Sequence, residues 1–306
     1  MVIPIALDRQ WFLDARLRNL SNAPPRQPSS APFDAKIFAM REWIGSGAEQ
    51  VVYGFPQHTA FKDIVIKEAK MRLPWRAALL SRLLVGSGEL SNLLTWREVG
   101  IVKRMDNVAI VDILGGYALP AFYIHGYASD GHGMPTNYCV QERIKGKSLL
   151  EVTRERPHLI LQNSEVRSSL LKIAWGSKLV TIQLGAPPDF HGGRNIMLTV
   201  DNRVVLIDTG FPSFLARVAS SVDLPLLVRY YCVAIIEYYL KYIIHLEHIL
   251  SPTLREERAL AERFRVSTHD FQSAMLNITR MRHELQNRIK LGRFIACADS
   301  LLRFSE

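Results

Sequence analysis

The 306-residue sequence has few cysteines, no long uncharged apolar run and fewer acidic than basic residues. Cys139, Cys232 and Cys297 are an odd number at wide spacing, which argues against a disulfide framework or a zinc ligand set and is typical of a reducing compartment. The most apolar region, 222–250, is interrupted by charged residues, so we expect no membrane-spanning helix. The first residues lack the basic segment of a secretory signal, so we also expect no secretory signal.

The composition is that of a folded protein with a surplus of positive charge. Hydrophobic residues make up 48% of the chain and charged residues 22%, close to the globular average, which excludes disorder for most of it. Thirty-eight Lys and Arg against 29 Asp and Glu leave a formal net charge of +9. This surplus favours a polyanionic partner, and it does not choose among a nucleotide, a nucleic acid, an anionic membrane and a phosphorylated glycolipid.

The chain reads as a strand-rich first third followed by a helix-rich remainder. Residues 1–33 are predicted to be an N-terminal appendage that ends in a Pro- and Ser-rich linker. Residues 34–142 contain short β-rich runs around one helical region, and residues 143–306 are predicted to be mostly helical. Helical spacing in this last part covers the ranges 165–185, 214–250, 252–265 and 269–304. Two short β-like runs joined at Asp201-Asn202 form a predicted hairpin within it.

The first candidate binding element is IGSGAEQVVYGF, residues 44–55, in which Gly45 and Gly47 lie between two β-like runs. Glycine lacks the Cβ that would hold a backbone away from phosphates, so such a loop can approach a nucleotide closely. Val52 falls where an apolar side chain would cover an adenine ring. A plain hairpin turn would give the same letters, and this alternative stays open. A strand-to-helix dinucleotide motif is disfavoured, because strand-like residues follow Gly47.

The second candidate is Lys67, which ends the apolar run IVIK one hairpin after the glycine-rich loop. Its ammonium group would reach phosphates under that loop, and a carboxylate from a helix would hold it there. Glu98 is the preferred carboxylate and Glu89 the second choice. The alternative is that Lys67 lies at the edge of a strand and exposes its ammonium group to solvent.

The strongest pattern is PPDFHGGRNIMLTVDNRVVLIDTG, residues 187–210. Asp189 can accept a proton from an attacking hydroxyl or orient that hydroxyl. Asn195 and Asp208 supply hard oxygen ligands that suit a magnesium ion bridging nucleotide phosphates. Gly210 lets the backbone turn sharply after Asp208. A surface hairpin with exposed carboxylates is the alternative, but the order and separation of the three patterns favour phosphoryl transfer.

Through these residues the chain resembles the protein-kinase-like superfamily over about residues 40–215. The matching positions are Gly45, Gly47 and Val52 for the glycine-rich loop, Lys67 for the strand lysine, Glu98 for the helix carboxylate, 140–149 with Glu142 for the interlobe hinge, Asp189 and Asn195 for the catalytic loop, and Asp208-Thr209-Gly210 for the metal-binding DFG. The resemblance implies an α+β bilobal fold with a small β-rich N-lobe and a larger helical C-lobe. It also implies ATP and Mg²⁺ as cofactors and transfer of the γ-phosphoryl group to a hydroxyl.

Three departures from the family pattern bear on activity. Asp189 and Asn195 are six positions apart where the family has five, and Pro187 stands where a His or Tyr is usual. A pseudokinase that binds nucleotide without transferring phosphate is therefore an alternative. No APE motif follows Asp208, which argues against regulation like that of eukaryotic protein kinases. Every charged residue that the chemistry needs is nevertheless present.

The acceptor is suggested by a narrower resemblance. The segment 70–101 is similar to the basic, Trp- and Leu-rich stretch of bacterial lipopolysaccharide core (Kdo/heptose) sugar kinases, and His191 fits small-molecule phosphotransferases. Arg72, Arg76 and Arg82 among leucines would form an amphipathic face able to lie on an anionic membrane. A helix packed on its own lobe with a solvated basic side is the alternative.

The sequence therefore predicts a bacterial kinase for which a sugar or glycolipid hydroxyl is the preferred acceptor. The alternative acceptor is a Ser or Thr of a protein, as for a host-directed effector. A cytoplasmic location is predicted, with peripheral attachment to the inner membrane and export as open alternatives. No nucleic-acid partner is expected, because the aromatic residues have the spacing of a helical core and no nucleic-acid-binding motif accompanies them.

Overall fold

The computed structural model describes residues 41–46, 50–55, 57, 62–69, 106, 109–115, 118–119, 123–129, 135–190, 193–210, 212–222 and 226–289. The chain forms two compact units. The first comprises Met1–Met105 with Leu119–Lys145, and the second comprises Asp106–Ala118 with Gly146–Glu306. The predicted appendage and linker, residues 1–33, lie outside the described residues, and the predicted domain boundaries stay a prediction.

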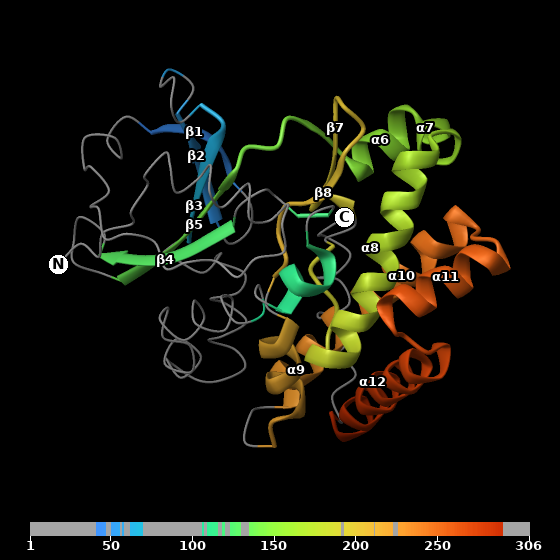
Figure 1. Ribbon diagram of the computed structural model, residues 1–306. Coiled ribbons are helices and arrows are strands. Elements are labelled where there is room, and N and C mark those ends of the chain that lie inside the picture. The colour runs from blue at the N-terminus through green and yellow to red at the C-terminus, as the bar shows by residue number, and fades with distance from the viewer. Residues whose placement is uncertain are drawn as a thin grey trace. The chain divides into compact units, whose positions relative to one another are not determined.

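The first unit contains a five-stranded antiparallel sheet (Figure 1). Its strands are β1 (Glu42–Ser46), β2 (Gln50–Gly54), β3 (Ile64–Ala69), β4 (Tyr123–Ser129) and β5 (Pro135–Glu142), in the order β1-β2-β3-β5-β4. The β-branched run Ile64–Ile66 is buried at the centre of this sheet, as is typical of an inner strand. Residues 64–69 therefore form a strand with a neighbour on each side.

The second unit is mainly helical. Its helices are α6 (Leu149–Glu155), α7 (Pro157–Gln162), α8 (Ser164–Leu184), α9 (Pro212–Ser220), α10 (Leu226–Leu250), α11 (Leu254–Phe264) and α12 (Thr268–Arg288). Residues 109–114 are helical as well. A three-stranded antiparallel sheet has the order β6 (Gly146–Ser148), β7 (Ile196–Thr199) and β8 (Val204–Leu206). The predicted α+β class is confirmed, with the small sheet near the N-terminus and a helical C-terminal part.

The predicted helical ranges contain helices, with two differences. The range 269–304 is found as α12 as far as Arg288, and residues 290–304 lie outside the described residues. Residues 165–185 and 252–265 correspond to α8 and α11, whereas 214–250 is divided between α9 and α10. Pro225 stands directly before α10 in the sequence, and proline has no N–H to continue a helix through that point. The spacing of apolar residues alone does not indicate this interruption between the two helices.

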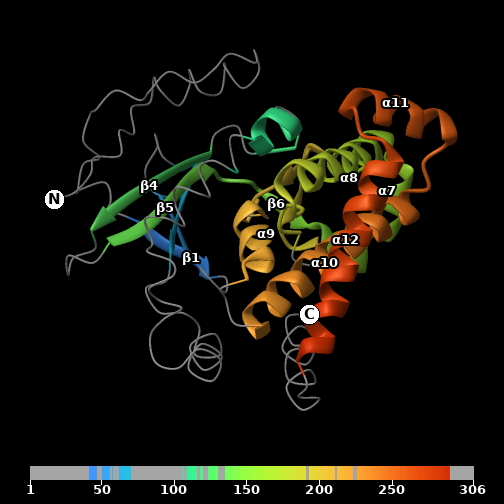
Figure 2. The same ribbon diagram turned by 90° about the horizontal axis from the view of Figure 1, so that it is seen from below.

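The core of the second unit lies where α8, α10 and α12 pack side by side (Figure 2). The inward faces of α8 and α10 are fully buried along most of their length, including Leu170, Ile173, Ile236 and Ile243. Within the described residues, no helix combines the length and apolar character required to cross a membrane.

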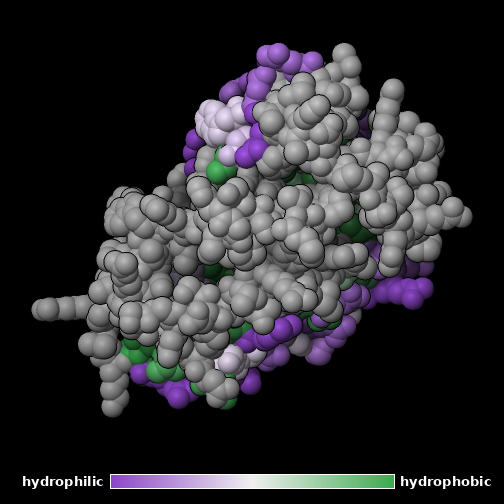
Figure 3. Space-filling model, turned by 90° about the vertical axis from the view of Figure 1, so that its left-hand side faces the viewer, coloured by the Kyte–Doolittle hydropathy of each residue, from purple (hydrophilic) through white to green (hydrophobic). Residues whose placement is uncertain are grey.

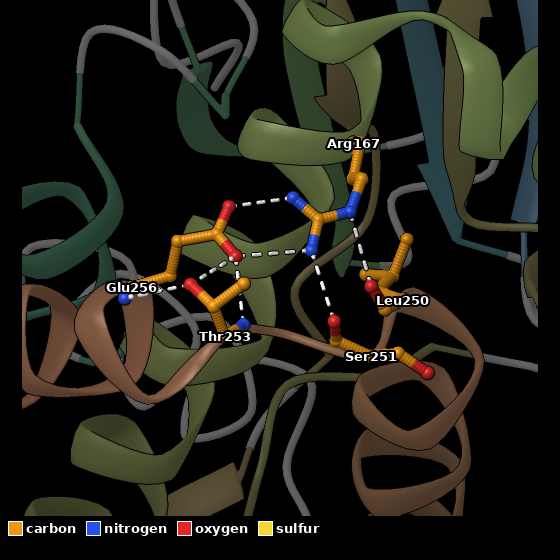
Figure 4. A network of polar contacts seen from close by, with 5 residues as sticks. All are labelled: Arg167, Leu250, Ser251, Thr253 and Glu256. Atoms are coloured by element: carbon orange, nitrogen blue, oxygen red, sulfur yellow. Dashed lines mark hydrogen bonds and ion pairs between the residues drawn. The ribbon is translucent and has the colours of Figure 1, made fainter.

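A polar network joins the N-terminal part of α8 to the connection between α10 and α11 (Figure 4). The guanidinium of Arg167 donates to both carboxylate oxygens of Glu256, at 2.6 and 3.1 Å, and to the carbonyls of Leu250 and Ser251. The Thr253 amide and hydroxyl also donate to Glu256, which completes a capping box at the start of α11. This network fixes the end of one helix to the beginning of the next.

On the face drawn in Figure 3, the hydrophobic residues drawn in colour form small separate spots. The most exposed large hydrophobic residues come from different elements: Trp43, Val200, Val222, Leu254 and Leu276. Single exposed apolar residues of this kind are ordinary on protein surfaces.

Candidate active site

The candidate nucleotide-binding residues of the first unit lie in one row across its sheet. Gly45 of β1 is opposite Val52 of β2, and Val52 is opposite Lys67 of β3. Residues directly opposite each other on neighbouring strands have their side chains on the same face. The sheet therefore brings Val52 and Lys67, which are separated by a hairpin in sequence, onto one face beside Gly45.

Two features of this row suit a phosphate-binding role. A Cβ added at Gly45 would meet no atom of the described residues within 4 Å, so there is room for a ligand to approach the backbone. Lys67 is only 6% exposed, and its strand position is fixed by pairing on both sides.

Of the other predicted nucleotide-binding residues, Gly47 and Glu98 lie outside the described residues. Glu142 ends β5 opposite Ile64 and is partly exposed.

The candidate catalytic residues of the second unit are joined by hydrogen bonds. The Asn195 side-chain amide donates to the Asp189 carbonyl at 3.1 Å, and the Ile207 amide donates to the Asn195 carbonyl at 2.8 Å. The Asp189 amide in turn donates to the Thr209 carbonyl at 3.2 Å. The segments that carry Asp189, Asn195 and Asp208 are therefore neighbours in space, and all three residues are intermediate between buried and exposed.

Gly210 is required by the close approach of two of these segments. Its φ of +63° is in the left-handed region, and a Cβ there would lie 2.8 Å from the Asp189 Cβ. Any other residue would be strained by its backbone and would collide with Asp189. The Gly210 amide donates to Asp208 Oδ1 at 3.0 Å, which holds the carboxylate in a local turn.

A backbone hydrogen bond of the turn type lies within the six positions from Asp189 to Asn195. The Gly193 amide donates to the Phe190 carbonyl at 2.8 Å, and Gly193 has a φ of +83°. The Asn195 side chain still reaches the Asp189 backbone from the far end of this turn. The extra residue therefore does not separate the two ends of the loop.

Tyr242 of α10 packs against this loop, a contact that was not predicted from the sequence. Its ring stacks on Phe190, with ring centroids 5.6 Å apart, and a Cβ on Gly193 would overlap its hydroxyl. Burial raises the pKa of the Tyr242 hydroxyl above its ordinary value, and Tyr238 nearby acts in the same direction. Tyr242 therefore stays neutral and serves as a packing partner for the loop.

The donor set of the second unit fits a magnesium ion. Asn195 and Asp208 offer amide and carboxylate oxygens, which Mg²⁺ prefers. Because the Asn195 nitrogen donates to Asp189, the amide oxygen is turned away from that bond. Within the described residues no group of three or more His, Cys, Asp or Glu could hold a metal ion. An ion at this site would accordingly complete its shell with water and phosphate oxygens.

Comparisons with known proteins find likeness in structure but not in sequence. No protein-family model matches this chain, and no curated protein matches it. Among similar solved structures is the Mycobacterium tuberculosis PknI kinase domain, at TM-score 0.37 and 14% identity over 78% of this chain and 96% of that chain. PpkA-294 is similar at TM-score 0.35 and 16% identity, over 84% and 92% of the two chains.

The MAP kinase LmaMPK10 from Leishmania major is similar at TM-score 0.35 and 14% identity, over 88% of this chain and 84% of that chain. Likeness at this identity and TM-score says nothing of what this chain does.

Proposed function

We propose that the chain is an ATP- and Mg²⁺-dependent phosphotransferase that transfers the γ-phosphoryl group of ATP to a hydroxyl. The observation that carries the proposal is the hydrogen-bonded arrangement of Asp189, Asn195 and the segment 207–210. It brings one carboxylate suited to a hydroxyl and two oxygen ligands suited to magnesium into one small region. Asp189, Asn195 and Asp208 are therefore assigned to the reaction.

Each residue has a distinct task in this proposal. Asp189 orients the acceptor hydroxyl and receives its proton as the oxygen forms a bond to the γ-phosphorus. The bond from that phosphorus to the β–γ bridging oxygen breaks, and ADP leaves with the electron pair. Asn195 and Asp208 would hold Mg²⁺, which neutralises phosphate charge when bound. Lys67 would pair with the α- and β-phosphates, and Glu98 would hold Lys67.

The remaining cofactor contacts belong to the first unit. Gly45 and Gly47 would approach the phosphates, Val52 would cover the adenine, and Glu142 at the end of β5 would lie at the hinge. The basis is the row of Gly45, Val52 and Lys67 across the sheet. A nucleotide needs these three kinds of contact together: open backbone, an apolar cover and a positive charge.

The proposal has two versions, which differ in the molecule that accepts the phosphoryl group. A sugar or glycolipid hydroxyl is favoured by the basic segment 70–101, which lies outside the described residues. A protein Ser or Thr is the alternative. Incubation with labelled ATP and either lipopolysaccharide fragments or a protein mixture separates them, because the label moves to only one class of acceptor.

The test of the reaction is labelled-ATP turnover, with and without Mg²⁺, in matched variants. Lys67→Ala and Asp208→Ala should each lower turnover by at least about 10²-fold, because each removes charge compensation at the phosphates. Asp201→Ala is the control, since Asp201 is exposed in the turn between β7 and β8. Full activity in both site variants would refute the assignment. Mg²⁺-dependent ATP binding with no transfer to any acceptor would instead support a pseudokinase.

A further inference from the structure

One segment of the second unit comes from a distant part of the sequence. Residues 106–118 stand between β3 and β4 in the chain, yet they belong to the second unit. Two backbone amides donate to this segment: Leu206 N to the Ala118 carbonyl at 2.7 Å, and Ser213 N to Asp106 Oδ2 at 3.0 Å. Leu206 is two residues before Asp208 and Ser213 is five residues after it. The candidate metal ligand is therefore bracketed by hydrogen bonds to a single segment.

Asp106 is unusual because its carboxylate is almost completely buried. The residue is 2% exposed, and this burial raises the pKa of the carboxyl, while hydrogen bonds from Ser213 and the charge of Arg217 act in the opposite direction. A buried carboxyl group needs donors to offset the loss of water. Ser213 lies in the first turn of α9, where amides have no partner inside the helix. Asp106 thus caps α9 from outside its own stretch of chain.

The segment 106–118 is itself held firmly. Ile110, Leu114 and Ala118 are fully buried. Leu114 packs against Gly176 of α8 so closely that a Cβ on Gly176 would overlap it. Asp106 and Ala118 are therefore presented to the chain around Asp208 from a packed support, and not from a solvated loop.

We propose that Asp106 is a positioning residue for the candidate metal-binding segment Asp208–Gly210. Resting on the proposed function, this inference gives Asp106 the task of fixing the chain after Asp208, while the Ala118 carbonyl fixes the chain before it. Asp106 touches neither Asp208 nor a phosphate in this role. It acts through Ser213 and the start of α9, and it limits how far the Asp208 carboxylate can move from its magnesium-binding position.

The test measures backbone exchange and magnesium dependence in the full-length protein. Asp106→Ala and Asp106→Leu both remove the acceptor, and the second keeps most of the buried volume. Asp106→Asn keeps an accepting oxygen, and Asp112→Ala alters an exposed position of the same segment. Amide hydrogen exchange is followed at residues 206–213, and ATP binding is titrated with MgCl₂ in parallel.

We expect faster exchange at Ser213 and at 208–210 in Asp106→Ala and Asp106→Leu, with α8 and α10 unchanged. The MgCl₂ concentration for half-maximal ATP binding should rise about 10-fold, as is typical when an outer support of a metal ligand is lost. ATP binding without magnesium should not change. Asp106→Asn should restore most of the wild-type behaviour, and Asp112→Ala should match the wild type.

Three results would overturn the inference. The first is unchanged exchange at 208–213 in both removal variants. The second is faster exchange spread equally over α8 and α10, which would mean that Asp106 contributes to global stability alone. The third concerns the wild-type protein: the Ser213 amide exchanges its hydrogen as fast as a solvent-exposed amide does. If wild-type ATP binding proves independent of magnesium, the proposed function fails, and the exchange data alone still decide whether Asp106 holds this segment.

Discussion

Replacing Arg167 by methionine tests how strongly the second unit depends on one polar network. Methionine keeps the length of the side chain and removes four hydrogen bonds, two to Glu256 and two to the carbonyls of Leu250 and Ser251. The Arg167 side chain is 21% exposed and the Glu256 side chain 38% exposed, so water replaces only part of what is lost. The bidentate geometry is the strong form of such a contact.

The expected cost is about 2 kcal/mol in the free energy of unfolding, the usual range for hydrogen bonds to a charged group after allowance for solvent screening. For a unit of the length of the second unit this corresponds to a fall in Tm of roughly 4–8 °C. Lys147→Met is the matched control, because the Lys147–Glu155 ion pair is about half exposed on both sides. Its loss should cost less than about 0.5 kcal/mol.

Urea unfolding followed by far-ultraviolet circular dichroism measures both variants against the wild type. The pH dependence gives a second check, because the hydrogen bond from Arg167 lowers the pKa of Glu256 from 4.5 to about 2. A lowered folded-state pKa means that the stabilisation is complete above about pH 4.5 and is lost as the pH falls toward 2. The gap between wild type and Arg167→Met should narrow over that window, to what the two hydrogen bonds to the carbonyls of Leu250 and Ser251 contribute. Equal losses in Arg167→Met and Lys147→Met at pH 7 would refute the reasoning.

Three further substitutions have defined outcomes. Gly210→Ala should destabilise the second unit by about 1–2 kcal/mol, since alanine is strained at this φ, and should reduce phosphoryl transfer; thermal melting and ATP turnover measure the two effects. Tyr242→Ala should cost about 3–5 kcal/mol, whereas Tyr242→Phe keeps the stack on Phe190 and should cost far less in the same melts. Lys178→Met leaves the Glu247 carboxylate without its 2.7 Å ion pair and should cost about 3–5 kcal/mol in urea unfolding; adding Glu247→Leu should recover most of the loss.

Local signals in the sequence predicted much of the fold. The hairpin around Asp201-Asn202 is found as β7 and β8, because a short apolar run on each side of a turn pair favours it. The helix predicted over 252–265 is found as α11, which begins with the Thr253–Glu256 capping box. Each of these elements depends on residues that are neighbours in the chain.

What the sequence did not predict depends on contacts between distant residues. Asp106 stands between Met105 and Asn107, and nothing near it in sequence indicates a partner at Ser213, 107 positions away. The stack of Tyr242 on Phe190 also joins distant positions, and Tyr242 lies in a helix whose many aromatic residues are indistinguishable by spacing. The sheet order, with β5 between β3 and β4, is a third example, since it is fixed by pairing across the sheet. Side-chain periodicity contains no information about such pairs.

The spacing of Asp189 and Asn195 shows why sequence alone gave an ambiguous view of the candidate site. Counted along the chain, six positions instead of five indicate a damaged loop. In the structure, the Gly193 amide donates to the Phe190 carbonyl, and the Asn195 side-chain amide is bonded to the Asp189 carbonyl. Gly193 has a φ of +83°, and a Cβ there would overlap the Tyr242 hydroxyl, so glycine is required at this position. Loop length is therefore a weaker argument for a pseudokinase than the loss of a charged residue would be, and Pro187 is the departure that activity measurements must address.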